Sequence, residues 1–437
     1  MQTMGNNMSP ADKEFLWTFP TDIRTARKLL GGPKTTTYAC CPACNSLYPP
    51  RQDDGFLIYP YVCTSGPCQL RGGCKLLKVG STPDGKGKSI GVPQRPFVMQ
   101  DFHDFVARLL SRPGVEAAIR RSGERVCEET VEDIVTADGV KAIKGPDGAP
   151  FLSGGQPDKL HLLWCLSVDF FNPYQNKIAG KVASVGSIVM SCLLLPPDMR
   201  HKPENLCLVG IIPGPCEPSG AEIDHFLRPL VEVMKESWAH GAIYGTHDYP
   251  HGRLVRSAIA LSVNDLPMAR KIMGTANYVD RNTAKGGNMD LWRVRTLQKV
   301  QEDADKWRRA TSQKERKRLY GKTGVRHSVL MELEYWNPTT MVPVDCMHLF
   351  FIGLLQYHAR TVLGMDSGGT QARNAKDTKT TIGRLEDARK ILHTSPQSLD
   401  LRALTVDVLK ALCEERGIGV TRPGRACKED LITSLKV

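Results

Sequence analysis

The chain has 437 residues, of which 41% are hydrophobic and 24% charged, so it contains enough apolar material for a sizeable core spread over two to four domains. Its formal net charge of +12 favours attraction to polyanions, among which nucleic acid is the most common, but determines no fold. Residues 1–19 show no signal peptide, and the most apolar window, residues 184–196, is too short and polar to cross a bilayer. We therefore expect an intracellular protein without a membrane partner.

After an N-terminal segment, residues 1–37, cysteines cluster in residues 38–78. The pair Cys41 and Cys44 has the C-x2-C spacing of a zinc knuckle, and Cys63, Cys68 and Cys74 follow. Zinc needs four ligands in a tetrahedron, and we favour the set Cys41, Cys44, Cys63 and Cys74, with Cys68 as the alternative fourth ligand. Such a site would be structural rather than catalytic. The competing interpretation is a group of free thiols in a turn-rich segment.

The next segments predict a linker, a helical region and then a mixed α/β body. A Gly/Ser/Pro/Lys linker covers residues 79–93, and the region 95–140 has helical spacing with a break at residues 111–114. A Gly/Pro-rich loop follows at residues 141–159. The apolar pattern then predicts strands at residues 161–168, 182–195, 206–212 and 253–263. It also predicts a helix opened by Ser219, with Glu222 completing a capping box, and a short helix at residues 266–273.

The order of strand, strand, strand, helix, strand, helix in residues 160–275 predicts an RNase H-like mixed sheet. Asp169 ends the first strand and Asp265 follows the fourth. Because those strands are neighbours in that fold, the two carboxylates should meet although 96 positions separate them. Carboxylates are the ligands that magnesium prefers, and paired ions held this way support phosphoryl transfer. The competing interpretation makes each aspartate a strand-end or helix-cap residue.

Residues 276–365 begin with a highly charged segment, residues 289–319, which we expect to be helical. Its most basic stretch, residues 314–318, fits a nuclear-import signal or a solvated helix face. Residues 342–363 are mostly apolar and indicate either one helix or a strand followed by a helix. A polar linker covers residues 366–381, and residues 400–437 form a small unit with a helix, loop, helix pattern.

Several blocks resemble the CACTA (En/Spm-like) DNA transposases in their fungal form. The first contains Leu166-Ser167-Val168-Asp169-Phe170-Phe171, and the second contains Asp265-Leu266-Pro267-Met268. A third contains Val344-Asp345-Cys346-Met347-His348, and the cysteine region fits the N-terminal zinc-binding region of the family. Further blocks lie between these in the family's order, at residues 176–181, 202–205, 209–215, 225–230, 252–256 and 335–338.

The resemblance implies an RNase H-like fold that cuts the ends of a transposable element and joins them to target DNA. It implies that Asp169 and Asp265 are the first two catalytic acids, which would hold magnesium or manganese. Asp345 and His348 correspond to the family's D-x2-H pair, with a structural or metal-linked role, although His348 also fits a histidine on an apolar helix. The expected partners are terminal-repeat and target DNA, the expected location is the nucleus, and self-association is left open.

Two features depart from the family pattern. The knuckle that usually follows the second acid is missing, because residues 274–290 contain no cysteine. The third catalytic acid is also missing, since none of the downstream candidates, Glu386, Glu414 and Glu415, lies in a matching block. We therefore expect a chain cut short before that acid. The alternative is a non-catalytic DNA-binding remnant or regulator, and a third option is an unrelated intracellular zinc protein.

The small unit at residues 400–437 resembles a SAP module, which binds DNA through helix ends and basic side chains. Four basic side chains would face phosphate, namely Arg416, Arg422, Arg425 and Lys428. The competing interpretation is a helical hairpin that packs on the core.

Overall fold

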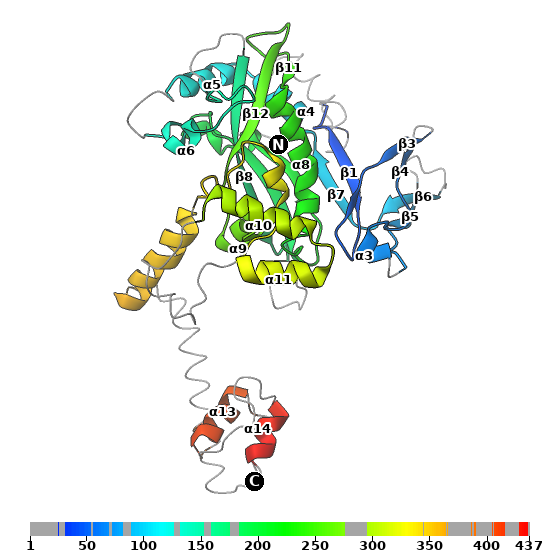
Figure 1. The fold of residues 1–437 in the computed structure, drawn as a ribbon, viewed down its shortest axis with the longest axis vertical. Helices are drawn as coiled ribbons and strands as arrows, with labels where there is room; N and C mark the ends of the chain where they lie inside the picture. Colours follow the sequence, from blue (N-terminus) through cyan, green and yellow to red (C-terminus); the bar gives the residue numbers. More distant parts are fainter. Residues whose placement is uncertain are drawn as a thin grey trace, which may run out of the picture. The chain divides into compact units, whose positions relative to one another are not determined.

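The computed structural model describes residue 25, residues 31–53, 56–69, 72–81, 89–125, 132–152, 159–174, 183–275, 295–343, 345–363 and 365, and residues 386, 389, 404, 406–415 and 428–435. These residues belong to two units, one up to Asp345 and one from Cys346 onward. Figure 1 shows both units.

The first unit is built on an eight-stranded mixed sheet with the strand order β11-β12-β8-β9-β10-β7-β1-β2. Only β12 and β8 pair in parallel, and the other neighbours are antiparallel. The strands are β1 (Thr35–Cys40), β2 (Leu47–Tyr48), β7 (Pro96–Gln100), β8 (Lys159–Phe171), β9 (Val185–Cys192), β10 (Leu206–Ile212), β11 (Ala242–Tyr244) and β12 (Arg253–Ser262). This sheet lies in the upper body in Figure 1.

The four strands expected in residues 160–275 are all present, and β10 has the predicted bounds. The expectation that β8 ends at Asp169 is wrong, because the ladder with β9 continues to the pair Phe171 and Val185. Asp169 therefore lies inside the strand, where it pairs with Ser187. The expected neighbourhood of the first and fourth strands is confirmed by the parallel pairing of β8 with β12.

Two helices cover one face of this sheet. In α4 (Phe102–Leu110), the rings of Phe102 and Phe105 lie edge-on to Trp164 of β8, at centroid distances of 5.4 and 6.1 Å. In α8 (Ile223–Ala239), Phe226 meets Phe97 of β7 at 5.3 Å. The apolar residues of each helix recur at helical spacing, so each buries one side on the sheet. The main core lies between these helices and the strands.

The helix ends follow from local polar contacts. The predicted capping box is present only in part: Glu222 accepts a hydrogen bond from the Ser219 backbone N–H at 2.7 Å, but α8 begins after Glu222 rather than after Ser219. The other predicted helix, α9 (Leu266–Met273), has the expected bounds. Gly274 ends it at φ 72°, and a Cβ there would lie 2.5 Å from the Arg326 carbonyl oxygen, so only glycine fits.

Two expectations for the N-terminal third are wrong. Residues 96–100 form strand β7 rather than the start of a helix, because they pair with both β1 and β10. The expected linker at residues 79–93 contains parts of a hairpin, β5 (Leu77–Ser81) with β6 (Ser89–Pro93). The predicted break is confirmed between α4 and α5 (Val115–Glu124). The remaining short elements are β3 (Arg51–Asp53), β4 (Phe56–Ile58), α3 (Gly66–Gln69) and α6 (Asp138–Lys141).

The ion pair between Arg200 and Asp133 joins the short helix α7 (Pro197–Arg200) to the N-cap of the 3-10 helix η2 (Ile134–Thr136). The guanidinium donates two hydrogen bonds to the carboxylate, at 3.0 and 2.7 Å, and two more to the carbonyl oxygens of Leu193 and Leu195. The two side chains are only 8% and 11% exposed. Burial opposes ionisation of Asp133, but its hydrogen bonds with Arg200 outweigh that effect, so its pKa is lowered.

We expect Arg200→Ala to lower the free energy of unfolding by about 3–5 kcal/mol, because Asp133 would be left buried without its counter-charge. Chemical denaturation measures this loss beside Arg121→Ala, an exposed control that should change stability by less than about 0.5 kcal/mol. Because the folded-state pKa of Asp133 is depressed, its contribution is present above its ordinary pKa and lost as the pH falls. On acidification, Arg200→Ala should therefore lose less stability than the natural chain or Arg121→Ala. Equal losses in Arg200→Ala and Arg121→Ala would contradict the assignment.

The second unit contains the helical segments η7 (Met347–Leu355) and η8 (His358–Val362) and the helices α13 (Val406–Glu415) and α14 (Lys428–Leu435). The apolar stretch predicted at residues 342–363 is thus helical in its second part. The helices α13 and α14 pack around a small core, as the helix, loop, helix pattern predicts. That core consists of Val408, Leu409, Leu412, Cys413, Leu431, Ile432 and Leu435. None of the helices in the described ranges has the length and apolar content that crossing a bilayer requires.

Candidate functional site

The register between β8 and β12 sets where the two candidate catalytic aspartates lie. Ser262 is opposite Leu166, and the Val263 N–H donates to the Leu166 carbonyl at 3.0 Å. One residue further, the Asn264 side chain accepts from the Val168 N–H at 2.7 Å. Asp169 directly follows Val168, and Asp265 directly follows Asn264. The fold therefore places both aspartates at the same end of two adjacent parallel segments.

Each carboxylate has one oxygen fixed by the backbone. The Phe170 N–H donates to Asp169 Oδ1 at 2.8 Å, and the Met268 N–H donates to Asp265 Oδ1 at 2.8 Å. The second bond makes Asp265 the N-cap of α9, which confirms the helix-cap interpretation of this residue. The cap occupies only Oδ1. Within the described residues, the structure gives neither Oδ2 a hydrogen bond. Both aspartates therefore combine a fixed orientation with one oxygen that can bind a cation.

Asp169 projects from the sheet face opposite to that covered by α4 and α8. Its cross-strand partner Ser187 is in turn paired with Ile211, and Ile211 with Val98, so these side chains share a row. Ile211 and Val98 are 44% and 39% exposed, and Asp169 is exposed as well. The face around Asp169 is thus open to solvent, which suits a large substrate better than a small one.

The described residues bring no third metal ligand to this pair. No group of three His, Cys, Asp or Glu side chains with ligand atoms within 4.8 Å includes Asp169 or Asp265. The downstream candidates Glu386, Glu414 and Glu415 lie in the second unit, where Glu415 forms an ion pair with Arg389. A site made of two aspartates alone supplies oxygen ligands of the right chemistry for magnesium, but fewer of them than two ions need.

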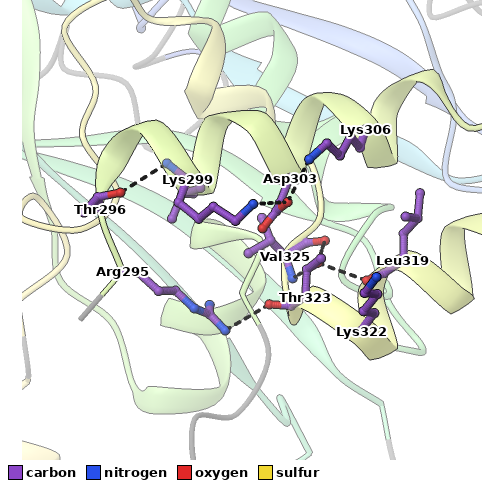
Figure 2. A pocket seen from close by; sticks show the side chains of 10 residues that line it. Arg295, Thr296, Lys299, Asp303, Lys306, Leu319, Lys322, Thr323 and Val325 are labelled. Carbon is purple, nitrogen blue, oxygen red and sulfur yellow. Dashed lines mark hydrogen bonds and ion pairs between the residues drawn. The ribbon is translucent and has the colours of Figure 1, made fainter. Parts of the chain in front are cut away.

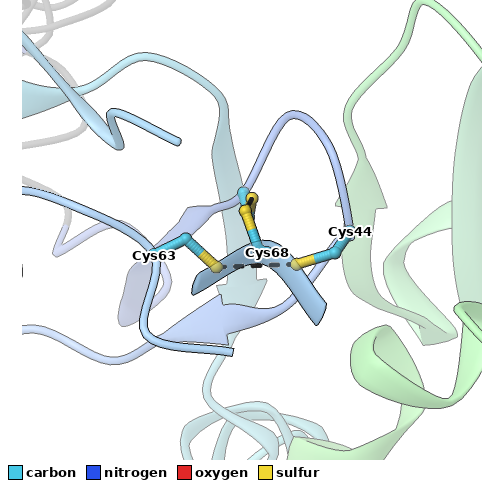
Figure 3. A group of neighbouring side chains, drawn as sticks. Cys44, Cys63 and Cys68 are labelled. Carbon is cyan, nitrogen blue, oxygen red and sulfur yellow. Dashed lines mark hydrogen bonds between the residues drawn. The ribbon is translucent and has the colours of Figure 1, made fainter. Parts of the chain in front are cut away.

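The cysteines of the N-terminal region form a compact group of four thiols. The ligand atoms of Cys41, Cys44, Cys63 and Cys68 all lie within 4.8 Å of one another, and three of the four side chains are buried. Figure 3 shows how the thiols of Cys44, Cys63 and Cys68 converge from separate segments. The sulfur atoms of Cys44 and Cys63 are 3.5 Å apart, and those of Cys41 and Cys68 are 3.8 Å apart.

These distances fit a zinc tetrahedron. A zinc–sulfur distance of about 2.3 Å gives sulfur–sulfur edges of about 3.8 Å, whereas a disulfide would need about 2.05 Å. The backbone supports the arrangement, since Cys41 N–H donates to the Ser46 carbonyl and Cys63 N–H to the Cys74 carbonyl, at 3.0 and 2.8 Å. Four soft thiolate donors are the set that a structural zinc ion takes, and the geometry leaves no open position for catalysis.

Hydrogen bonds around the thiols affect their ionisation. Burial opposes ionisation of Cys44, but its hydrogen bonds with Ser46 and with the neighbouring thiols outweigh that effect, so its pKa is lowered to about 7. Burial raises the pKa of Cys41. The Tyr48 hydroxyl lies 3.2 Å from Cys63 Sγ, a contact that sequence reasoning missed although Tyr48 lies in the cysteine region. Zinc binds thiolates, so a group with one thiol that ionises near neutral pH is prepared to take up the ion.

Cys74 is not part of this group of four. We favoured it over Cys68 as the fourth ligand, but the structure places Cys68 in the group and leaves Cys74 as a hydrogen-bonding neighbour of Cys68. The short helix α3 accounts for the difference, because its first turn bonds the Cys68 N–H to the Ser65 carbonyl at 2.9 Å and turns that thiol toward the knuckle. Spacing alone does not reveal this turn.

The remaining predicted residues lie at the end of the first unit, in the second unit, or outside the described ranges. Asp345 is the last residue of the first unit, whereas His348 is an exposed residue of η7 in the second. Lys428 begins α14. Three of the predicted phosphate contacts lie outside the described residues, namely Arg416, Arg422 and Arg425.

Comparison with known proteins bears on the segment that contains both aspartates. Residues 155–316 match the model of the transposase family tnp2. The matched segment contains β8, β9, β10, α8, β12 and α9, and it runs through α10 into the start of α11. Among curated proteins, none matches the chain. The tnp2 match supports the transposase interpretation, and it covers the part of the fold in which Asp169 and Asp265 come to the same end of the sheet.

Proposed function

We propose that the chain is a DNA transposase of the CACTA type, in which Asp169 and Asp265 hold divalent cations for phosphoryl transfer at element ends. The observation that carries this proposal is the parallel pairing of β8 with β12 inside the segment that matches the tnp2 family. That pairing places both carboxylates at one end of adjacent strands. The sheet order β10-β9-β8-β12, with only the last pair parallel, is the arrangement expected of an RNase H-like core.

In this mechanism the protein's backbone fixes the two carboxylates, and an exposed sheet face beside Asp169 is available to the DNA. The Phe170 and Met268 N–H groups orient the two carboxylates, and the duplex would contact the exposed sheet face beside Asp169. Magnesium or manganese bound there would stabilise the charge that develops on the phosphate. The expected partners are the element's terminal repeats and its target DNA, and the expected location is the nucleus. The cysteine group would hold a structural zinc ion that stabilises the N-terminal region.

A cleavage assay tests this function. Purified chain is incubated with duplexes from either end of the element that encodes it, in magnesium or in excess chelator. We expect strand breaks at the element end in magnesium, and none with the chelator. Binding without breaks in either magnesium or manganese would overturn the catalytic part of the proposal.

The second candidate is a non-catalytic DNA-binding protein derived from a transposase. One observation favours it, because no third His, Cys, Asp or Glu joins the two aspartates within the described ranges. With fewer carboxylates, a site holds divalent ions less tightly and neutralises less of the charge in the transition state. In the cleavage assay this candidate predicts retention of the duplex on the protein without any product.

A further inference from the structure

The densest concentration of positive charge in the described residues is a pair of helices in the first unit. It consists of α10 (Leu297–Arg309), α11 (Gln313–Thr323) and the flanking residues out to Arg295 and Val325, and we call it the basic helical pair. It contains ten Lys and Arg against four Asp and Glu. The pair therefore holds half of the net charge of +12 in a small part of the chain. The sequence predicts one charged helical segment at residues 289–319, but Ser312 is the N-cap of a second helix.

Neither packing nor internal ion pairing explains the charge on α11. This helix buries none of its residues. Its five basic residues, Lys314, Arg316, Lys317, Arg318 and Lys322, face a single acid, Glu315, and the described part of the chain shows no ion pair to any of the five. A helix that is polar all round gains little from the core, and it usually compensates with ion pairs along its surface. Arg316 contacts the Trp307 ring and the Ala310 carbonyl, and the other four basic side chains are exposed, where water or an external anion can neutralise them.

A half-open cavity of about 700 Å³ lies between the two helices, and its ten lining residues comprise four cations, one acid and five uncharged residues. Figure 2 shows the side chains of Lys299 and Lys306 at Asp303, which lies between them on α10, with Arg295 and Lys322 also at the cavity. Asp303 is 8% exposed and lies 3.2 Å from Lys299 Nζ and 3.6 Å from Lys306 Nζ. One carboxylate thus faces four cations, and the cavity keeps an excess of positive charge.

Specific contacts join α10 to α11 and attach the basic helical pair to the rest of the first unit. The Arg316 guanidinium lies 5.0 Å from the centre of the Trp307 ring and donates to the Ala310 carbonyl at 3.1 Å, which joins the two helices at their turn. At the other end, Arg326 N–H donates to the Gly274 carbonyl at 2.8 Å, and the Arg326 side chain pairs with Asp224 of α8 at 3.1 Å. The basic surface is therefore held on the same body as β8 and β12.

We propose that the basic helical pair binds the sugar-phosphate backbone of duplex DNA without reading its sequence. The inference rests on the proposed function, since it assigns a DNA contact to a surface outside the candidate catalytic site. Its chemistry is the release of condensed counterions when lysine and arginine neutralise phosphates. Such contacts position a protein on the duplex and carry no sequence information, because basic side chains on an exposed helix reach phosphate oxygens rather than base edges.

The test is the salt dependence of binding to a labelled 30-base-pair duplex of arbitrary sequence, measured by fluorescence anisotropy with the full chain. The test variant combines Lys314→Gln, Lys317→Gln, Arg318→Gln and Lys322→Gln. The control variant removes the same charge at four exposed positions of the same unit, through Arg121→Gln, Lys144→Gln, Lys159→Gln and Lys202→Gln. A third variant keeps the charge, with Lys314→Arg, Lys317→Arg and Lys322→Arg.

We expect the test variant to bind about 10–100-fold more weakly at about 0.1 M salt, with a slope of log affinity against log salt shallower by about 2–4. The control and the charge-keeping variant should keep the slope of the natural chain. Circular dichroism on each variant shows whether weaker binding comes from a lost contact or from a lost fold. The charge-keeping variant changes the same helix without removing charge, so it tests whether substitution in α11 by itself affects binding.

Two outcomes would overturn the inference. Equal slopes in the test and control variants would show that only net charge matters. Loss of binding to single-stranded RNA of equal length, with duplex binding unchanged, would assign the surface to a different nucleic acid. Absence of any salt-dependent duplex binding by the natural chain is a separate result, because it removes the proposed function itself and with it this surface.

Discussion

Replacing Asp169 with asparagine is expected to abolish magnesium-dependent cleavage of element ends while leaving DNA binding intact. Asparagine keeps the size and one oxygen of the side chain but loses the negative charge that attracts a divalent ion. A loss of about 4 kcal/mol of transition-state stabilisation corresponds to about a 1,000-fold slower reaction. Because Asp169 is exposed and its Oδ1 only accepts from Phe170 N–H, the fold should tolerate the change.

The same change at Asp265 should have the same effect on cleavage. An asparagine oxygen still accepts from the Met268 N–H, so the cap of α9 is kept and stability should change little. Asp198→Asn is the matched control, since this aspartate is exposed and lies outside the site. Cleavage rates are compared by gel electrophoresis under single-turnover conditions. Unchanged cleavage by either Asp169→Asn or Asp265→Asn would show that the acid in question holds no catalytic ion.

Replacing Cys68 with serine is expected to remove zinc from the protein, whereas the same change at Cys74 should leave one zinc ion per chain. Cys68 belongs to the group whose sulfur–sulfur distances fit a zinc tetrahedron, and Cys74 does not. A structural zinc ion contributes about 10–16 kcal/mol of binding free energy in small zinc domains, so its loss should unfold the cysteine region. Mass spectrometry of the metal content, with limited proteolysis of residues 31–81, measures both effects.

A chelator should reproduce the Cys68→Ser result on the natural chain. Chelation and Cys68→Ser should both expose the cysteine region to protease, and added zinc should restore protection only to the natural chain. Zinc lost from Cys74→Ser and kept in Cys68→Ser would restore the ligand set that spacing favoured. An absence of zinc from the natural chain would support free thiols instead.

The sequence predicts the α/β body well because its strands and helices carry strong local signals. Residues 206–212 are apolar and lie between turn-forming residues, and they form β10 with those bounds. Asp265 and Pro267 mark the start of a helix, and Gly274 marks its end, so α9 also has its predicted bounds. The expected adjacency of the first and fourth strands follows from element order, which limits the sheet topologies available.

Features that depend on long-range pairing are the ones that local patterns miss. Residues 96–100 have an apolar spacing that fits a helix, but β1 and β10 provide partners on both sides and make them a strand. The end of β8 is set by its partner β9 rather than by Asp169. In the cysteine region, spacing favours Cys74 over Cys68, whereas the turn of α3 brings Cys68 into the group of four thiols. The basic helical pair was visible as charge, but its cavity depends on the break at Ser312.

The most direct test of the central claim is anomalous diffraction from crystals of the protein grown with manganese. The account predicts anomalous density at the end of β8 and β12, within bonding distance of a carboxylate oxygen of both Asp169 and Asp265. Manganese bound elsewhere, with these two carboxylates too far apart to share an ion, would contradict it.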